Sequence, residues 1–367
     1  MNRLRSHSIA DRFSFSGLRC LLQYSTSTAH FMVDYLIDSL GFSREEAISA
    51  STKVTHLKSP KNPDLVLNLL KQIGFDNTQI KSIVFSAPTL LSSDVDKTLK
   101  PKIRVLQDLG LSGSDLAKFI KGNRGLFNRG LDTHIIPSLD YLRRALRSDE
   151  NVIRALKRSQ WLLTCNTLKK MPPNVLLLRK CGLSIEKIEK FIINNPRYVL
   201  QKPEWLEEIV HRVEEELGIP RVSRMFLYGI DALASSSKST LERKFGIFRS
   251  FGWSNSEIST MARNLPYCLS LSEAKIRNAL NYFMKEIGYA PGYLASHPKL
   301  LMHSLEKRVV PRNEVLKILI EKKLNKSKQS LYAVVCLTES KFIEDYVLPY
   351  KNKMPDLYGA YNNRMRQ

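Results

Sequence analysis

The stretch 251–273, FGWSNSEISTMARNLPYCLSLSE, contains the pattern that decides the fold. Gly252 and the apolar residue after it are typical of a helix C-terminus, because glycine adopts the left-handed backbone conformation there at little steric cost. The motif Ser254-x-x-Glu257 is a capping box that starts the next helix. Pro266 ends this helix, since proline lacks the backbone N–H that a helix interior requires. The stretch therefore predicts the end of one helix, a complete short helix and the turn that closes it.

The same glycine pattern recurs along the chain. Glycines followed by an apolar residue stand 33, 36, 72, 36, 34 and 36 residues apart, at Gly41, Gly74, Gly110, Gly182, Gly218, Gly252 and Gly288. The double step leaves room for one unit whose glycine is replaced, and we place that position at Leu146. The capping signal is repeated at Ser43-x-x-Glu46 and Asp76-x-x-Gln79. Recurrence at a nearly fixed period indicates an array of structural repeats.

Each unit also closes its first helix with a similar turn. An apolar pair marks this turn, at Leu90-Leu91, Leu126-Phe127, Leu162-Leu163, Tyr198-Val199 and Cys268-Leu269. A unit of about 36 residues cannot bury its apolar face alone, so neighbouring units must stack. We therefore predict an all-α superhelical solenoid, right- or left-handed, of about seven to eight repeats with two to three helices each. We expect it to occupy residues 31–330 without an internal domain boundary, followed by a C-terminal helical cap and tail over 331–367.

The first thirty residues differ in composition from the rest. They contain four arginines and six serines but only one acidic residue, Asp11. Arginine-rich, serine-rich and acid-poor segments are typical of organellar import peptides. We interpret residues 1–30 as such a presequence, with an ordinary basic tail as the alternative. The spacing of the arginines favours the mitochondrion over the chloroplast.

The charge balance points to polyanionic partners. The chain has 57 Lys+Arg against 35 Asp+Glu, a formal net charge of +22. Such an excess predicts attraction to nucleic acid first and to an anionic membrane surface second. The five cysteines are scattered and no pair has C-x-x-C spacing, which argues against a disulfide framework or a zinc site. No apolar run approaches the length of a membrane-spanning helix.

Signatures of enzyme chemistry are missing from the sequence. It has no P-loop, no G-x-S-x-G and no H-E-x-x-H motif, and its seven histidines are dispersed. We therefore predict a non-enzymatic protein with no cofactor, no bound metal and no small-molecule substrate.

The pattern resembles the mitochondrial transcription termination factor (mTERF) family, in its plant organellar type. The likeness lies in the Gly-apolar-Ser start and Pro-x-Leu-Leu close of the units, and in Phe251-Gly252-Trp253-Ser254, Leu269-Ser270-Leu271-Ser272-Glu273 and the terminal Phe342, Tyr346-Val347, Tyr350, Pro355 and Tyr358. The resemblance implies a superhelix of three-helix repeats that binds double-stranded nucleic acid along a basic concave face, in organellar transcription, termination or intron splicing. Two units depart from the pattern, the one around Leu146 and the one in which Pro298 follows Gly288 after only ten residues.

Basic clusters recur where the last helix of a unit begins. They comprise Lys100, Lys102 and Arg104; Lys169 and Lys170; Lys275 and Arg277; and Lys307, Arg308 and Arg312. Recurrence predicts that they lie on one side of the solenoid and contact successive phosphates, which confers affinity without sequence information. Arginine can also bond the edge of guanine in a forked geometry, which makes Arg143, Arg144, Arg147 and Arg154 candidates for base contacts. Trp161, Tyr198 and Tyr267 have rings that can stack on bases, although such positions are usually core.

The favoured function is therefore double-stranded DNA binding in organellar transcription regulation or termination, by a monomer. Binding of structured RNA in group II intron splicing is one alternative. A repeat scaffold for an acidic protein partner is another.

Overall fold

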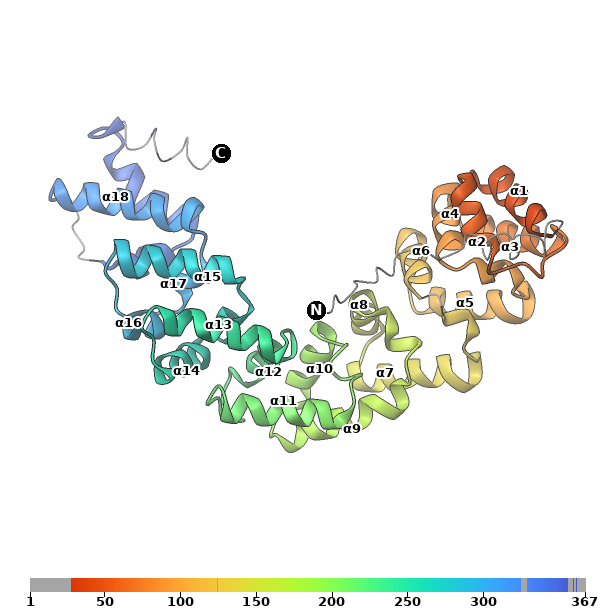
Figure 1. The fold of residues 1–367 in the computed structure, drawn as a ribbon, viewed down its shortest axis with the longest axis horizontal. Coiled ribbons are helices and arrows are strands. Elements are labelled where there is room, and N and C mark those ends of the chain that lie inside the picture. Colours follow the sequence, from red (N-terminus) through yellow and green to blue (C-terminus); the bar gives the residue numbers. More distant parts are fainter. Residues whose placement is uncertain (1–27, 124, 325–328, 356–358, 360, 362–367) are drawn as a thin grey trace, which may run out of the picture. The chain divides into compact units, whose positions relative to one another are not determined.

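The computed structural model describes residues 28–123, 125–324, 329–355, 359 and 361. It is 74% helical and, within those residues, has no β-strand, which confirms the predicted all-helical repeat fold (Figure 1). The presequence predicted for residues 1–30 lies outside the described residues, except for the three that begin the first helix.

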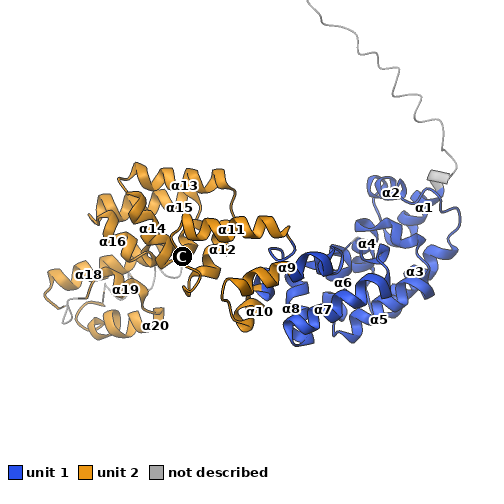
Figure 2. Ribbon diagram, turned by 90° about the horizontal axis from the view of Figure 1, so that it is seen from below, with its two compact units in different colours: residues 1–172, 192–200 blue, residues 173–191, 201–367 orange. Residues whose placement is uncertain are grey.

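The chain divides into two compact units (Figure 2). Unit 1 comprises Met1–Pro172 and Ile192–Leu200, and unit 2 comprises Pro173–Phe191 and Gln201–Gln367. No feature of the sequence marks this division, because the series of regularly spaced glycines from Gly41 to Gly288 (the glycine register) runs through it unchanged.

Unit 1 is built from pairs of helices joined by short turns. Its helices are α1 (Thr28–Leu40), α2 (Arg44–Ser51), α3 (Lys61–Gln72), α4 (Asn77–Ser86), α5 (Lys100–Asp108), α6 (Gly113–Gly122), α7 (Ile136–Leu146) and α8 (Asp149–Arg158). The 3-10 turns η1 (Pro88–Ser92), η3 (Leu126–Asn128) and η5 (Gln160–Leu163) close α4, α6 and α8. The π-helical turns η2 (Val95–Leu99) and η4 (Leu131–Ile135) lead directly into α5 and α7. Helices α9 (Thr167–Lys180) and α10 (Ile185–Asn194) contribute residues to both units.

Unit 2 continues the same construction. Its helices are α11 (Pro203–Glu215), α12 (Phe226–Ala234), α13 (Lys238–Ser250), α14 (Asn255–Asn264), α15 (Glu273–Leu280), α16 (Pro291–Ser296), α17 (Lys299–Met302), α18 (Val310–Glu321), α19 (Leu331–Cys336) and α20 (Glu339–Phe342). Its short turns are η6 (Pro266–Ser270), η7 (Asn281–Glu286), η8 (Leu305–Val309), η9 (Ile343–Val347) and η10 (Leu348–Tyr350).

The backbone conformation confirms the glycine register. All seven register glycines have positive φ, between 62° and 105°. In the unit without a glycine, the left-handed residue is Arg147, with φ of 64°, and not Leu146, which is buried in the last turn of α7. Lys323, with φ of 55°, ends α18 in the same way 35 residues after Gly288.

The predicted helix starts and turns are also present. Both interactions of the capping box form at Ser43 and Glu46, Asp76 and Gln79, and Ser254 and Glu257. The apolar pairs that follow the first helix of a unit are buried in the core, from Leu90 and Leu91 to Cys268 and Leu269. These turns matter for the site, because their carbonyl groups accept hydrogen bonds from side chains of the preceding repeat.

Candidate nucleic-acid interface

A polar side chain links consecutive repeats at regular positions. Lys102 of α5 is only 6% exposed, and its Nζ donates a hydrogen bond of 2.5 Å to the carbonyl of Phe127 in η3. Lys244 of α13 donates in the same way to the carbonyl of Leu269 at 2.6 Å. A cation is favourable at this place because the carbonyls that end a helical turn carry partial negative charge. Burial lowers the pKa of both lysines.

Four further side chains make equivalent contacts. We name six of these contacts the inter-repeat ties: Asn62 to Leu91, Lys102 to Phe127, Asn174 to Gln201, Lys244 to Leu269, Lys275 to Met302 and Arg312 to Leu337. In every case the donor lies on the second helix of one repeat, and the acceptor carbonyl lies in the segment that closes the first helix of the next. The ties hold neighbouring repeats together, and four of the six donors are cationic.

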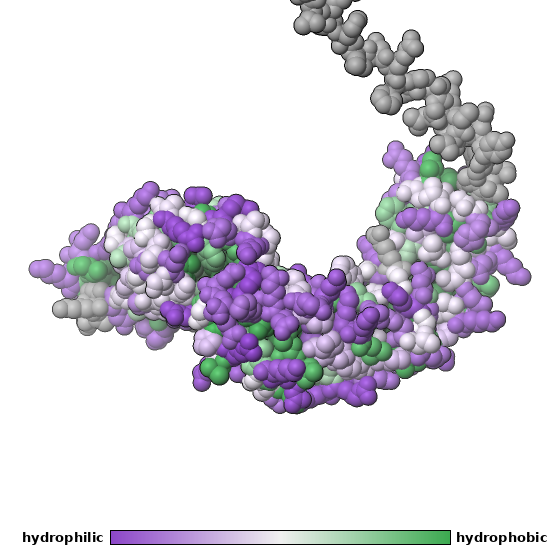
Figure 3. All heavy atoms as spheres, turned by 60° about the horizontal axis from the view of Figure 1, so that its bottom comes forward, coloured by the Kyte–Doolittle hydropathy of each residue, from purple (hydrophilic) through white to green (hydrophobic). Residues whose placement is uncertain are grey.

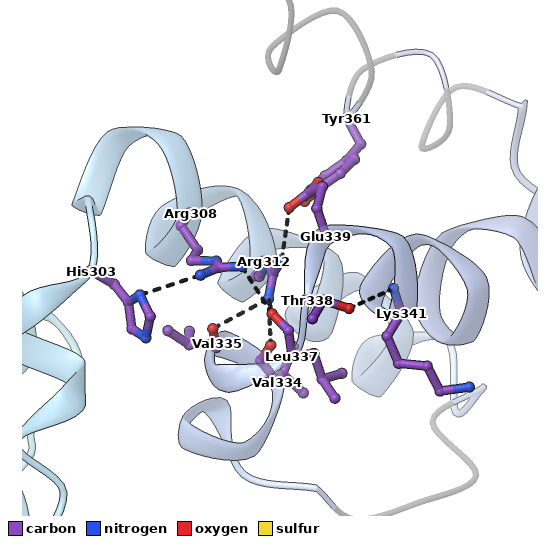
Figure 4. A network of polar contacts seen from close by, with 10 residues as sticks. All are labelled: His303, Arg308, Arg312, Val334, Val335, Leu337, Thr338, Glu339, Lys341 and Tyr361. Atoms are coloured by element: carbon purple, nitrogen blue, oxygen red, sulfur yellow. Dashed lines mark hydrogen bonds and ion pairs between the residues drawn. The ribbon is translucent and has the colours of Figure 1, made fainter. Parts of the chain in front are cut away.

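Arg312 is the most extensively bonded of these donors (Figure 4). Its guanidinium is fully buried, and Nη1 donates to the carbonyls of Val334 and Leu337, each at 2.8 Å. Nη2 pairs with the Glu339 carboxylate at 2.7 Å, and the group lies over the Phe342 ring, 4.6 Å from its centroid. The charge of Arg312 is thus paired with Glu339 inside the protein, while its buried Nε has no hydrogen-bond partner.

These contacts correct the predicted phosphate-binding set. Lys102 and Arg312 are buried and bonded to backbone carbonyls, so neither reaches a phosphate. Lys275 is half-buried and held by Met302, and half-buried Arg308 donates to the Leu337 carbonyl at 2.9 Å. Sequence reasoning placed these four with the exposed cations because a buried lysine or arginine looks the same in a charge pattern.

Two other predicted residues are already paired with carboxylates. Lys100 bonds to Asp96 at 2.7 Å one turn away. Arg143 is half-buried between Asp140 and Asp149, and its Nε donates to Asp149 at 2.7 Å. The Asp149 carboxylate raises the pKa of the Arg143 guanidinium further above its usual range.

Five of the predicted cations are exposed and make no ion pair with any described residue. We name them the free cations: Arg104, Arg144, Lys169, Arg277 and Lys307. They lie on α5, α7, α9, α15 and η8, all of which belong to the second helices of repeats. Arg147 and Arg154 are also exposed, Arg154 with a hydrogen bond to Asn151, and Lys170 is half-buried.

The sequence interpretation missed other residues of the same kind, and Lys97 is an example. Lys97 is exposed in η2, at the start of the second helix of its repeat, and it precedes Lys169 by 72 residues, or two repeat lengths. This spacing was the signal in the sequence that could have identified Lys97.

Hydrophilic side chains predominate on the face shown in Figure 3, interrupted by small hydrophobic patches.

The three candidate stacking rings have different environments. Tyr198 is buried, so it is unavailable to a base. Tyr267 is partly exposed, and its ring meets that of Tyr228 edge-on at 5.5 Å. Trp161 is 63% exposed at the start of η5, although its position in the closing turn suggested a core residue.

The described part of the chain holds no group of three or more His, Cys, Asp or Glu side chains suited to a metal ion. None of the described helices is long and apolar enough to cross a membrane.

The fold and the site together define a helical-repeat protein with free cations on the second helices of its repeats. The mTERF family model matches residues 67–227 and 220–343, and the chain belongs to this family. Members of the family are non-enzymatic nucleic-acid-binding regulators, which confirms the prediction that the chain is not an enzyme.

Two plant proteins are similar to the chain. Transcription termination factor MTERF8, chloroplastic, of Arabidopsis thaliana is 20% identical over 268 residues, which cover 71% of this chain and 51% of that protein. Transcription termination factor MTEF18, mitochondrial, of the same species is 24% identical over 273 residues, covering 74% and 46%. The chain thus spans about half the length of each of these relatives.

Proposed function

We propose that the chain binds double-stranded nucleic acid through the free cations and acts in organellar transcription regulation or termination. The observation that carries the proposal is the placement of Arg104, Arg144, Lys169, Arg277 and Lys307 on second helices, exposed and unpaired in a member of the mTERF family. An unpaired cation does not have to break an ion pair within the protein when it binds a phosphate. Its full charge is therefore available to the backbone of a duplex.

Double-stranded DNA is the proposed target because both relatives are named transcription termination factors. Structured RNA, as in group II intron splicing, is the alternative, since phosphate contacts serve either duplex. One relative is named mitochondrial and the other chloroplastic. The arginine-rich, acid-poor segment 1–30 favours the mitochondrion for this chain.

The proposal is tested by equilibrium binding of residues 28–367 to matched duplex DNA, duplex RNA and single strands over a series of salt concentrations. We expect the affinity for one duplex to fall steeply with salt. The double variant Arg104→Ala/Lys169→Ala should reduce the slope of log K against log salt by about 1.8, because each phosphate contact contributes about 0.9.

The matched control is Lys118→Ala/Lys121→Ala, which removes the same charge from the exposed side of the first helix α6. We expect it to change the slope by less than half as much. Equal losses in both variants would show general charge attraction and contradict the proposed interface. Absence of duplex binding would direct attention to an acidic protein partner.

A further inference from the structure

The series of inter-repeat ties is interrupted within unit 1. Ser138 of α7 follows Lys102 by 36 residues and precedes Asn174 by 36, so it occupies the tie position of its repeat. Its side chain is fully buried, and its Oγ has no hydrogen-bond partner. A serine is too short to reach a carbonyl of the next repeat, as the longer Lys102 does.

We call the interface between two consecutive repeats a seam. The carbonyl group that would accept a tie from the Ser138 position also differs from its equivalents at other seams. Lys102, Lys244 and Arg312 each reach a carbonyl 25 residues ahead, and the corresponding carbonyl for Ser138 is that of Leu163 in η5. No described side chain donates to Leu163. The neighbouring carbonyl of Leu162 instead accepts from Thr167 of its own repeat. Among the described residues, no side-chain hydrogen bond therefore joins η5 to α7.

The opposite side of the same seam is well bonded. Lys157 of α8 pairs with Asp115 of α6 at 2.6 Å, and the amide of Gln160 donates to the Lys118 carbonyl at 3.3 Å. The first helices are thus held together while the second-helix side lacks its tie. A seam bonded in this way is expected to separate on its untied side.

Loss of a tie does not by itself weaken a seam. In α11 the corresponding position is Val210, which is buried and apolar. There α12 packs so closely on α11 that a Cβ on Gly229 would lie 2.9 Å from the Val213 side chain. Close apolar packing replaces the tie at that seam, whereas Ser138 leaves a buried hydroxyl without a partner.

We propose that the seam between α7 and η5 is a compliant joint, at which the second helices of unit 1 open and close. Each repeat of a solenoid contacts only its neighbours, so the weakest interface is where the array opens first. The joint would let the second helices of unit 1 adjust their spacing to a bound duplex, and this last step rests on the proposed function.

The joint is tested by amide hydrogen exchange of the free protein, residues 28–367. The amides of Thr164 and Cys165 bond to Trp161 beside the untied seam, and the amide of Arg129 bonds to Leu126 beside the tied one. We expect protection factors at least about tenfold lower at Thr164 and Cys165 than at Arg129, since the loss of a bond to a charged donor weakens closure by about that factor.

Two substitutions test the tie directly, one by adding a donor at the untied seam and one by removing the donor at the tied seam. Ser138→Lys supplies a donor for Leu163 and should raise protection at Thr164 about tenfold. Ser138→Ala removes the unpaired hydroxyl without supplying a tie, so it should raise protection less than Ser138→Lys does. Lys102→Met removes the neighbouring tie and should lower protection at Arg129 about tenfold.

Equal protection at the two seams in the parent protein, or no effect of Lys102→Met on Arg129, would overturn the proposal, even where Ser138→Lys fails to fold. Because exchange is measured without nucleic acid, failure of duplex binding leaves this result intact. A confirmed joint in a protein that binds no duplex would remove only the proposed function.

Discussion

At the residue scale, the structure separates cations that hold the fold from cations that face solvent. Lys102 and Arg104 are two positions apart on α5, yet one is buried on a carbonyl and the other is exposed and unpaired. This difference depends on which way each side chain points from the helix, and adjacent lysines and arginines give no sign of it in the sequence.

Replacing the most buried cation should destabilise the protein strongly. Arg312→Met removes the donor of several buried bonds and leaves Glu339 and three carbonyls without it. We expect a loss of about 2–4 kcal/mol in the free energy of unfolding of unit 2, measured by urea titration. Lys341→Met is the control, because its ion pairs are exposed to solvent and should contribute little to stability. Similar losses in the two variants would contradict the role given to Arg312.

His303 should make the stability of the protein depend on pH. Burial, together with the nearby charges of Arg308, Arg312, Lys275 and Lys299, lowers its pKa from 6.5 to about 4. Between pH 6.5 and about 4, the unfolded chain therefore binds a proton at His303 and the folded chain does not. Acidification through this range favours the unfolded chain, so the stability that neutral His303 contributes is complete above pH 6.5 and is lost progressively as the pH falls to about 4.

The measurement is urea unfolding at pH 7, 5.5 and 4.5. His303→Gln should show a smaller loss of stability on acidification than the parent protein. The exposed His211 provides the control variant His211→Gln, which should follow the parent curve. Parallel curves for the parent and His303→Gln would show that His303 has no such effect.

At the scale of single elements, helix ends were the most predictable feature. At Gly110 the amide of Leu111 bonds to the Leu106 carbonyl and closes the helix over a left-handed glycine. α7 ends differently, because Arg147 takes the left-handed conformation and its own amide bonds to Arg143 at 2.7 Å. The sequence interpretation was wrong by one residue here, since without glycine no residue type marks the position.

Restoring glycine at that helix end should stabilise unit 1. A residue with a Cβ pays a steric penalty at φ of 64°, so we expect Arg147→Gly to raise the free energy of unfolding by about 1 kcal/mol. Arg144→Gly, three residues earlier and within α7, should instead lower it by about 1 kcal/mol. Thermal unfolding of the two variants measures both changes, and a loss of stability in Arg147→Gly would show that contacts of the arginine outweigh the strain.

At the scale of the whole molecule, unit 1 includes residues that come after a segment of unit 2 in the chain. The stretch Ile192–Leu200 belongs to unit 1, and it contains the buried side chains of Ile192, Tyr198 and Val199. The units are therefore not consecutive halves of the chain.

Truncation should reveal this arrangement. We expect a fragment of residues 28–172 to have a lower melting temperature than a fragment of residues 28–200, because the shorter one lacks buried apolar side chains of unit 1. Circular dichroism during heating measures the difference. Equal melting temperatures would show that unit 1 is complete at Pro172.

The sequence alone determined the helical class, the repeat length and most helix ends, because capping and left-handed termination depend on a few residues close together in the chain. It also identified the mTERF resemblance and the excess of positive charge. Only the tertiary structure decided which of those charges are free, that Ser138 interrupts the ties and that the array forms two units. Each of these depends on contacts between residues about 25 or more positions apart, and on burial, which the residue type of a lysine, arginine or serine does not reveal.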